Sequence, residues 1–293
     1  MGLVGVALAG VLLVGRSRGS GAGVALDPAI FAPRACVAFA PTSGDRDQTV
    51  FLDAGHGGID PGGVGTTVAG RPIYEADVNL PIELNAMQLL RARGFRVVVS
   101  RTRNSTVVRL GGGDVSDGAL SIQGSHDDVA ARDVCANLAK ADVLVGIYMD
   151  AGASPQNAGS VTSYDADRPF SPANRRLAGL LQNDVLSTMN AQGWNIPDEG
   201  VLPDTNLGSY VGSSTAGGIA GAAAAYDHLL LIGPAMSGFF STPSQMPGAV
   251  IEPLYLTDPF EGSIAGSRHG QQVIARGIAR AVDQFLAPAS KPK

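Results

Sequence analysis

Residues 49–63 read TVFLDAGHGGIDPGG, and this stretch decides the fold class that the sequence predicts. Thr49–Leu52 is a short apolar run, which is typical of a buried β-strand. The strand is followed by a histidine set among glycines, and glycines let a ligand come close to the backbone. Because the sites of open α/β sheets form beyond the carboxyl ends of strands, His56 is the first candidate site residue.

Short apolar strands alternate with helical patterns along the rest of the chain. A helix is expected from Asp77, as its N-cap, to a stop at Gly94, with Pro81 in its first turn. The other expected elements are strands at 95–100, 142–148, 229–232 and 249–252, helices at 128–139, 174–192 and 271–286, and a glycine-rich loop at 111–124. This alternation predicts a single α/β domain with a mostly parallel central sheet flanked by helices on both faces.

Composition narrows the class of protein. Of the 293 residues, 45% are hydrophobic, which is enough for a sizeable core, and 39 are glycine, which predicts long surface loops. The formal net charge is −5 and the chain has no basic cluster. Nucleic acid is therefore not expected as a partner.

The first 25 residues resemble an export signal. Residues 1–15 are apolar but too short to span a bilayer comfortably, and Gly23-Val24-Ala25 resembles a cleavage site. We expect residues 1–25 to be a signal peptide or an N-terminal anchor. The protein is then exported to the periplasm, the cell wall or the extracellular space, and it contacts a membrane only if this segment stays uncleaved.

The composition of the remaining chain predicts its division into parts, and its two cysteines predict a disulfide. The expected parts are an N-terminal arm (26–47), a catalytic domain (48–287) with an insertion (209–246), and a tail (288–293). The insertion is expected because it contains a low-complexity run of Gly, Ala and Ser. An exported chain with an even cysteine count predicts a disulfide between Cys36 and Cys135, and the alternative is two buried free thiols.

Three residues form a candidate metal site. His56 follows the first strand, Glu75 precedes the first helix, and Glu252 ends the strand at 249–252. Zn²⁺ accepts imidazole and carboxylate ligands, and a catalytic zinc site keeps a position for water beside its protein ligands. A carboxylate that is not bound to the metal then acts as general base on that water.

This ordered set resembles the zinc-dependent N-acetylmuramoyl-L-alanine amidases of the amidase-3 type. DAGHGGIDPG at 53–62 is similar to the family's first zinc-ligand motif, Glu75 falls at its second ligand, and PGAVIE at 247–252 is similar to the segment with its catalytic glutamate. The resemblance implies a hydrolase with one zinc ion, held by His56 and Glu75, that cleaves the amide between N-acetylmuramoyl and L-alanine. Glu252 is then the general base and acid. Peptidoglycan and muropeptides are the implied partners, and we expect a monomer.

One position departs from the family pattern, because Tyr148 stands where the family has its third ligand, a histidine. A tyrosine hydroxyl is a poor neutral ligand, with an ordinary pKa of about 10, although bound zinc could lower that pKa. Three interpretations stay open. Tyr148 or the neighbouring Asp150 completes the metal site; His126 folds in as the substitute; or the site is degraded, and the protein binds peptidoglycan or regulates cell-wall hydrolysis.

Four further residues are given simpler roles. Asp53 is expected either to orient His56 or to cap the turn after the strand. Asp60, before Pro61, is expected to serve a turn. His228 and His269 are expected at the surface or at helix ends.

Overall fold

The computed structural model describes residues 23–206, 222 and 225–288. Its centre is an eight-stranded sheet with the order β1-β2-β6-β3-β9-β12-β10-β11. These strands are β1 (Val24–Ala25), β2 (Ala35–Phe39), β3 (Thr49–Ala54), β6 (Arg96–Arg101), β9 (Val143–Ile147), β10 (Ser160–Tyr164), β11 (Asp198–Pro203) and β12 (Gly248–Glu252). Two hairpins lie outside this sheet, β4 (Val64–Thr66) with β5 (Pro72–Tyr74) and β7 (Val115–Ser116) with β8 (Ala119–Leu120).

The middle of the sheet is parallel. Strand β3 pairs in parallel with β6 on one side and with β9 on the other, and β9 pairs in parallel with β12. Strands β10 and β11 are also parallel, whereas β2 joins β6, and β10 joins β12, in antiparallel fashion. Central parallel strands are covered on both faces and therefore need continuous apolar runs, and β9 is buried along its whole length.

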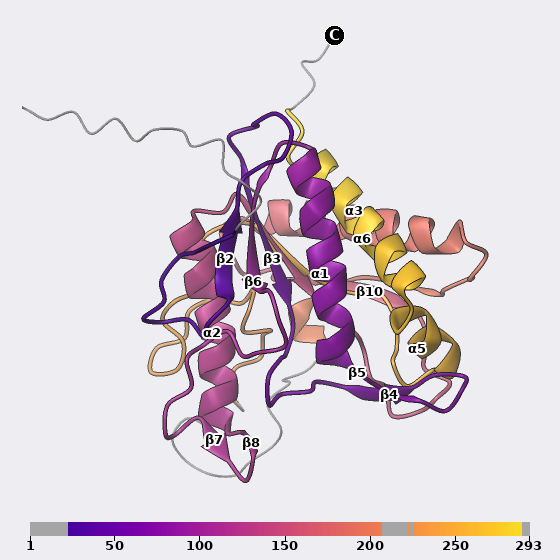
Figure 1. Cartoon of the computed structure of the whole chain (residues 1–293), viewed down its shortest axis with the longest axis horizontal. Coiled ribbons are helices and arrows are strands. Elements are labelled where there is room, and N and C mark those ends of the chain that lie inside the picture. Colours follow the sequence, from indigo (N-terminus) through magenta and orange to yellow (C-terminus); the bar gives the residue numbers. More distant parts are fainter. Residues whose placement is uncertain (1–22, 207–221, 223–224, 289–293) are drawn as a thin grey trace, which may run out of the picture.

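Helices cover both faces of the sheet. They are α1 (Glu75–Ala92), α2 (Ile122–Ala139), α3 (Ser171–Asn190), α5 (Pro259–Ala265) and α6 (Arg268–Phe285), with a 3₁₀ turn, η1, at Asp204–Asn206. Helix α2 lies on the opposite side of β2, β3 and β6 from α1 and α6 (Figure 1). The predicted single α/β domain with a mostly parallel, doubly covered sheet is confirmed.

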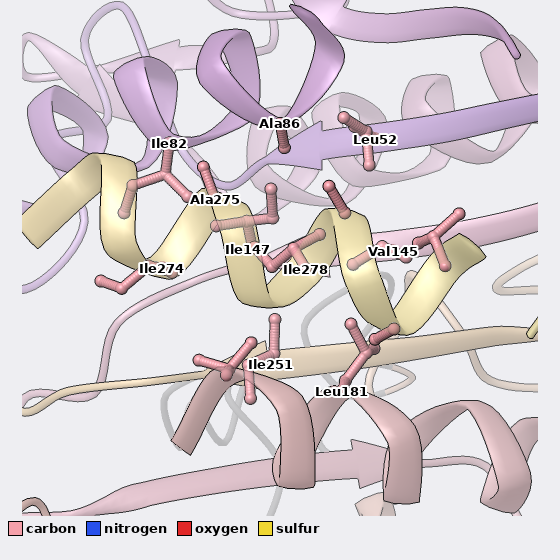
Figure 2. Close-up of a cluster of buried hydrophobic side chains, with 14 of the residues drawn as sticks. Leu52, Ile82, Ala86, Val145, Ile147, Leu181, Ile251, Ile274, Ala275 and Ile278 are labelled. Carbon is pink, nitrogen blue, oxygen red and sulfur yellow. The ribbon is translucent and has the colours of Figure 1, made fainter. Parts of the chain in front are cut away.

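The larger core forms where α1, α3 and α6 meet the sheet. Helix α6 points Ile274 and Ile278 toward side chains of α1 and of the central strands, among them Ile82 and Ile147 (Figure 2). The four-residue spacing of these isoleucines places them on one face of a helix, which is the pattern that predicted α6. Both are fully buried, so this face anchors the C-terminal helix to the sheet.

A disulfide joins the edge of the sheet to α2. Cys36 on β2 and Cys135 on α2 are bonded with their Cα atoms 5.7 Å apart, so the predicted pair is confirmed. Residues 26–47, expected as an arm, contribute β2 to the sheet, where Val37 pairs with Val99 of β6. The bridge links positions 99 residues apart in sequence, and a loop of that length restrains the unfolded chain strongly.

Several predicted boundaries were wrong. Helix α1 begins at Glu75 after the N-cap Tyr74, so Asp77 lies in the first turn, where its charge favours the helix dipole, and Pro81 lies beyond it. Helix α2 begins at Ile122, because the Ser121 side chain caps it by accepting from the Gly124 N–H, so the end of the expected loop is helical.

The apolar run at 229–232 was predicted as a strand and is a turn. The N–H groups of Ile232 and Gly233 both donate to the carbonyl of Leu229, which closes the chain on itself. Leu231 and Ile232 are buried in the core on the α2 face, so their hydrophobicity reflects packing rather than extended structure.

Some expectations fall on residues outside the described ranges. Residues 1–22 of the expected signal segment, 207–221 and 223–224 of the expected insertion region, and 289–293 of the tail lie there. No helix among the described residues combines the length and the apolarity needed to cross a bilayer.

Candidate active site

Three neighbouring strands bring the predicted site residues to one edge of the sheet. Strands β3, β9 and β12 are adjacent and parallel, and Ile147 of β9 pairs with Ala54 on one side and Ile251 on the other. The residues that follow these pairs include His56, Tyr148 and Glu252. They line one cavity of about 290 Å³, together with Glu75 from the start of α1.

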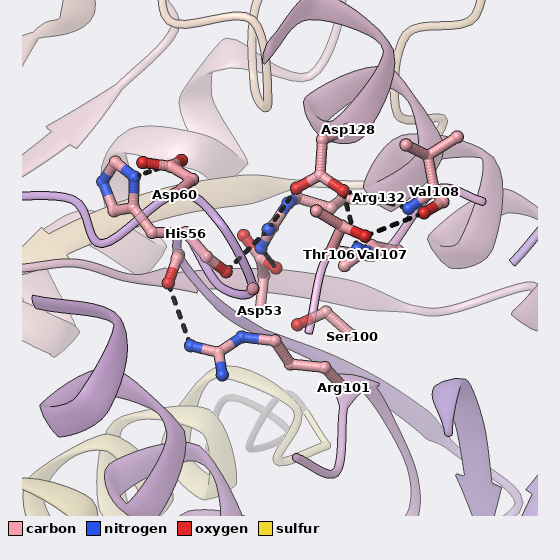
Figure 3. Close-up of polar contacts among 12 residues, drawn as sticks. Asp53, His56, Asp60, Ser100, Arg101, Thr106, Val107, Val108, Asp128 and Arg132 are labelled. Carbon is pink, nitrogen blue, oxygen red and sulfur yellow. Dashed lines mark hydrogen bonds and ion pairs between the residues drawn. The ribbon is translucent and has the colours of Figure 1, made fainter. Parts of the chain in front are cut away.

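His56 and Glu75 meet directly. His56 Nε2 lies 3.1 Å from Glu75 Oε2. On the other side of the ring, His56 Nδ1 lies 2.7 Å from Asp60 Oδ2 (Figure 3). His56 has a left-handed backbone, φ 60°, which turns the chain sharply after β3. A Cβ at Gly62 would come within 2.7 Å of both His56 and Glu75, so glycine at that position permits their contact.

Burial and charge set the protonation of this pair. Burial alone would raise the pKa of Glu75, but the His56 charge and N–H donors from Met149 and Gly63 hold it below its ordinary value. Burial alone would lower the pKa of His56, but Glu75 and Asp60 outweigh it and raise that pKa to about 10. The metal-free pair is therefore an imidazolium between two carboxylates.

The donor set of this pair fits a divalent metal ion. Two ligand atoms bound tetrahedrally to one zinc ion at about 2.1 Å lie roughly 3.4 Å apart, close to the observed 3.1 Å between His56 Nε2 and Glu75 Oε2. Metal-binding histidines usually donate their other ring N–H to a carboxylate, and Asp60 is placed to accept it. A metal ion would displace the proton that His56 carries between these groups.

Glu252 is a further acidic side chain that lines the cavity, and it is almost fully buried. Burial, followed by the nearby charges of Asp150 and Glu75, raises the pKa of Glu252 well above its ordinary value. The protonated form of Glu252 is therefore favoured in the metal-free protein. A carboxyl group that loses and regains a proton at this place is suited to acid and base chemistry.

The hydroxyl of Tyr148 is engaged in a separate polar network. It donates to Asp53 Oδ2 at 3.1 Å. Arg132 pairs with the other oxygen, Asp53 Oδ1, at 2.5 Å and with Asp128 Oδ2 at 2.7 Å (Figure 3). Burial and the charge of Asp53 raise the pKa of Tyr148, so its hydroxyl stays protonated. The Tyr148 ring lies edge-on to His56, with centroids 5.5 Å apart, and its hydroxyl serves Asp53.

The two other residues considered for the third ligand lie nearby. His126 on α2 lines the same cavity, with its Nδ1 2.9 Å from Asp127 Oδ1 and its ring against Phe239. Asp150 lies beside Glu252 and contributes to its raised pKa.

Sequence reasoning misassigned two polar residues, Asp53 and His228, and predicted only part of the role of a third, Asp60. Asp53 neither orients His56 nor caps a turn, because it accepts from Arg132 and Tyr148. Asp60 accepts the Gly62 N–H within a turn, as predicted, but it also contacts His56. His228 is mostly buried between Asp165 and Asp204 rather than at the surface. Asp60 and His56 are four residues apart on one glycine-rich loop, and this short separation was a signal for the contact between them.

Comparison with known proteins places this chain among the amidases. The family described as N-acetylmuramoyl-L-alanine amidase matches residues 50–284. The uncharacterized protein YqiI of Bacillus subtilis strain 168 is 24% identical over 239 residues, 81% of this chain and 84% of YqiI. The structure of the amidase AmiC2 of Nostoc punctiforme is 22% identical, covers 83% of this chain and 99% of that one, and gives a TM-score of 0.55. An amidase of Clostridium difficile 630 is 25% identical, with coverages of 83% and 98% and a TM-score of 0.54.

Proposed function

Because this chain belongs to the N-acetylmuramoyl-L-alanine amidase family, we propose that it hydrolyses the amide between the N-acetylmuramoyl group and L-alanine of peptidoglycan. The observation that carries the proposal is the contact of His56 Nε2 with Glu75 Oε2 in a cavity that Glu252 also lines. A metal-binding pair beside an acidic side chain that is not part of it is the arrangement that metal-assisted amide hydrolysis needs.

His56 and Glu75 would hold the metal, with Asp60 fixing the orientation of the imidazole. A zinc ion bound there would polarise the amide carbonyl, acidify its water and lower the pKa of Glu252 by its charge. Glu75 is held in place by the N–H groups of Met149 and Gly63, so the pair is organised before any ion arrives.

Glu252 would transfer the proton. As a carboxylate it takes a proton from the attacking water, and as a carboxylic acid it gives that proton to the departing amine of L-alanine. Its burial and its acidic neighbours hold its pKa high, which favours the acid half of the cycle. The carboxyl group ends the cycle as it began.

A second candidate function has one observation in its favour. The Tyr148 hydroxyl donates to Asp53, so the position of the family's third ligand offers a neutral phenol engaged elsewhere. A site reduced to His56 and Glu75 would hold metal weakly. In that case the protein binds peptidoglycan, or regulates its hydrolysis, without cutting it.

The test measures zinc content and release of stem peptides from purified muropeptides, using the wild-type chain and Glu75→Ala. If the proposal is right, the wild type binds zinc and releases stem peptides. Glu75→Ala then loses the activity and the zinc ion held by His56 and Glu75. An inactive wild type that gains activity in Tyr148→His supports the degraded site. An inactive wild type that stays inactive in Tyr148→His, yet sediments with cell wall, supports a binding role.

Export is part of the proposal. The Cys36–Cys135 bridge favours an oxidising compartment, and the family acts outside the cytosol by virtue of its substrate, peptidoglycan. We propose that residues 1–25 direct export as a signal peptide or anchor, and that the protein acts as a monomer. Peptide mapping of the secreted protein by mass spectrometry tests the cleavage.

A further inference from the structure

A second histidine–carboxylate cluster lies at the ends of two other strands. Strands β10 and β11 are parallel neighbours, with Tyr164 opposite Pro203, so the next residues, Asp165 and Asp204, both lie just past the carboxyl ends of these two strands. Because β10 runs antiparallel to β12, this is the opposite edge of the sheet from the carboxyl ends of β3, β9 and β12. His228 reaches the same place from the chain that precedes the 229–233 turn. Both aspartates are essentially fully buried.

The three side chains converge on one point. His228 Nδ1 lies 2.9 Å from Asp165 Oδ2 and 3.3 Å from Asp204 Oδ2, and one ligand atom from each residue lies within 4.8 Å of the other two. Despite this proximity, neither His228 Nδ1 nor Asp165 Oδ2 has an aligned hydrogen-bond partner among the described residues. Buried polar atoms without partners are rare in folded proteins and call for an explanation.

We propose that Asp165, Asp204 and His228 bind a divalent first-row transition-metal ion, of which Zn²⁺ fits best, at a site distinct from His56 and Glu75. One imidazole and two carboxylates form a donor set that such ions accept. The ion would give the unpartnered nitrogen and oxygen a common partner. The proposal does not depend on the amidase activity proposed above.

Backbone N–H groups hold both carboxylates of the cluster in place. Asp165 Oδ1 accepts the N–H groups of Asp167 and Arg168, both at 2.8 Å, which directs Oδ2 toward His228. Asp204 Oδ1 accepts from Thr205, and its Oδ2 accepts from Leu229. Backbone donors thus orient both carboxylates before an ion binds.

The local charge also favours a cation. Three carboxylates, those of Asp165, Asp167 and Asp204, face His228. Arg168 is the nearby positive side chain, but its guanidinium donates to the carbonyls of Gly233 and Ser244.

Asp167 would act as an outer partner. Its Oδ2 lies 3.7 Å from His228 Nε2, and its side chain is mostly exposed and therefore able to adjust. A metal on Nδ1 leaves the Nε2–H to donate, so Asp167 would accept it as Asp60 does from His56.

A metal here would fasten one wall of the active-site cavity. His228 and Leu229 to Leu231 line that cavity, and Leu229 also donates its N–H to Asp204. The ion would tie this segment to the ends of β10 and β11. We therefore expect it to stabilise the wall rather than to take part in the cleavage.

The experiment measures zinc bound per chain by elemental analysis after dialysis, using the full-length protein. The double variant His56→Ala/Glu75→Ala is expected to keep one ion, and adding Asp165→Asn and His228→Gln should remove it, with a loss of affinity of more than about 100-fold. Replacing only the exposed outer partner, in Asp167→Asn, should lower the zinc affinity by less than about tenfold. The expectation for His56→Ala/Glu75→Ala holds whether or not the first cluster binds zinc.

A second measurement guards against a folding defect. Hydrogen exchange of the backbone at 225–233 should slow when zinc is added to His56→Ala/Glu75→Ala, and should not respond in the variant that also carries Asp165→Asn and His228→Gln. Unchanged zinc content on adding those substitutions would overturn the proposal. So would absence of zinc from a folded His56→Ala/Glu75→Ala protein.

Discussion

Two imidazoles in this molecule lie between carboxylates at the carboxyl ends of parallel strands, and they are arranged differently. His56 uses both ring nitrogens, Nε2 toward Glu75 and Nδ1 toward Asp60, and the Asp60 contact has hydrogen-bond geometry. His228 presents a single nitrogen, Nδ1, to both Asp165 and Asp204, and it is unaligned with either.

The two histidines therefore differ in how carboxylates hold them. The His56 ring is oriented by a hydrogen bond, whereas His228 has two carboxylates near one ring nitrogen. At His56, Glu75 lies beside the ring nitrogen that would bind the metal, and Asp60 fixes the orientation of the ring. At His228, the buried carboxylates of Asp165 and Asp204 both lie beside the nitrogen that would bind the metal. The outer partner, Asp167, is more distant and exposed. We infer that the first cluster is built for chemistry beside Glu252, and the second for holding the cavity wall.

The largest expected difference between the clusters is catalytic. Replacing Glu252→Gln should lower the rate of amide cleavage roughly 10²–10⁴-fold, because the proton carrier is lost while both metal sites keep their ligands. Single-turnover cleavage of a muropeptide measures the rate. The matched control is Glu261→Gln, a buried acid outside the cavity lining, which accepts from the Tyr255 N–H. Equal loss in both variants would contradict the role of Glu252.

The pH dependence of zinc binding at the first cluster is the next largest effect. With its pKa raised to about 10, His56 is protonated at neutral pH, so each bound ion displaces a proton. Affinity should therefore rise roughly tenfold per pH unit, about 100-fold from pH 6 to 8. Titration of Asp165→Asn/His228→Gln isolates this cluster. In the metal-free protein, the stability that His56 contributes is complete below pH 6.5 and is lost as the pH rises toward 10.

The outer carboxylates should differ in importance. Asp60→Asn should weaken zinc binding at His56 by about 10–100-fold, because the ring loses the partner that orients it. Asp167→Asn should have a smaller effect at His228, since Asp167 lies 3.7 Å from the ring and is exposed. Competition with a chromogenic chelator measures both. Equal effects would remove the distinction between the two clusters.

The smallest expected effect concerns Tyr148, which borders the first cluster. Tyr148→Phe should destabilise the fold by about 1–2 kcal/mol, because the buried Asp53 loses a donor, and it should leave zinc affinity nearly unchanged. Tyr255→Phe is a milder control, since its hydroxyl donates to the exposed Glu199. Urea unfolding measures the free energy. A large fall in zinc affinity in Tyr148→Phe would instead indicate that the phenol binds metal.

Much of this architecture follows from local sequence patterns. Apolar runs predicted the central strands β3, β6, β9 and β12, because a strand buried on both faces needs apolar residues at nearly every position. The four-residue spacing of Ile274 and Ile278 predicted α6 in the same way. The strand predicted at 229–232 was wrong for a related reason, because an apolar run does not distinguish a buried strand from a packed turn.

The sequence by itself determined the α/β fold, the cysteine pair, and the order His56, Glu75, Glu252, because these depend on periodicity, on residue type and on strand ends. Only the tertiary structure decided that Tyr148 donates to Asp53 and that His228 lies between Asp165 and Asp204. Those contacts join side chains from separate strands, helices and turns. Their partners are selected by burial and charge once the chain has folded, and no spacing along the chain encodes that selection.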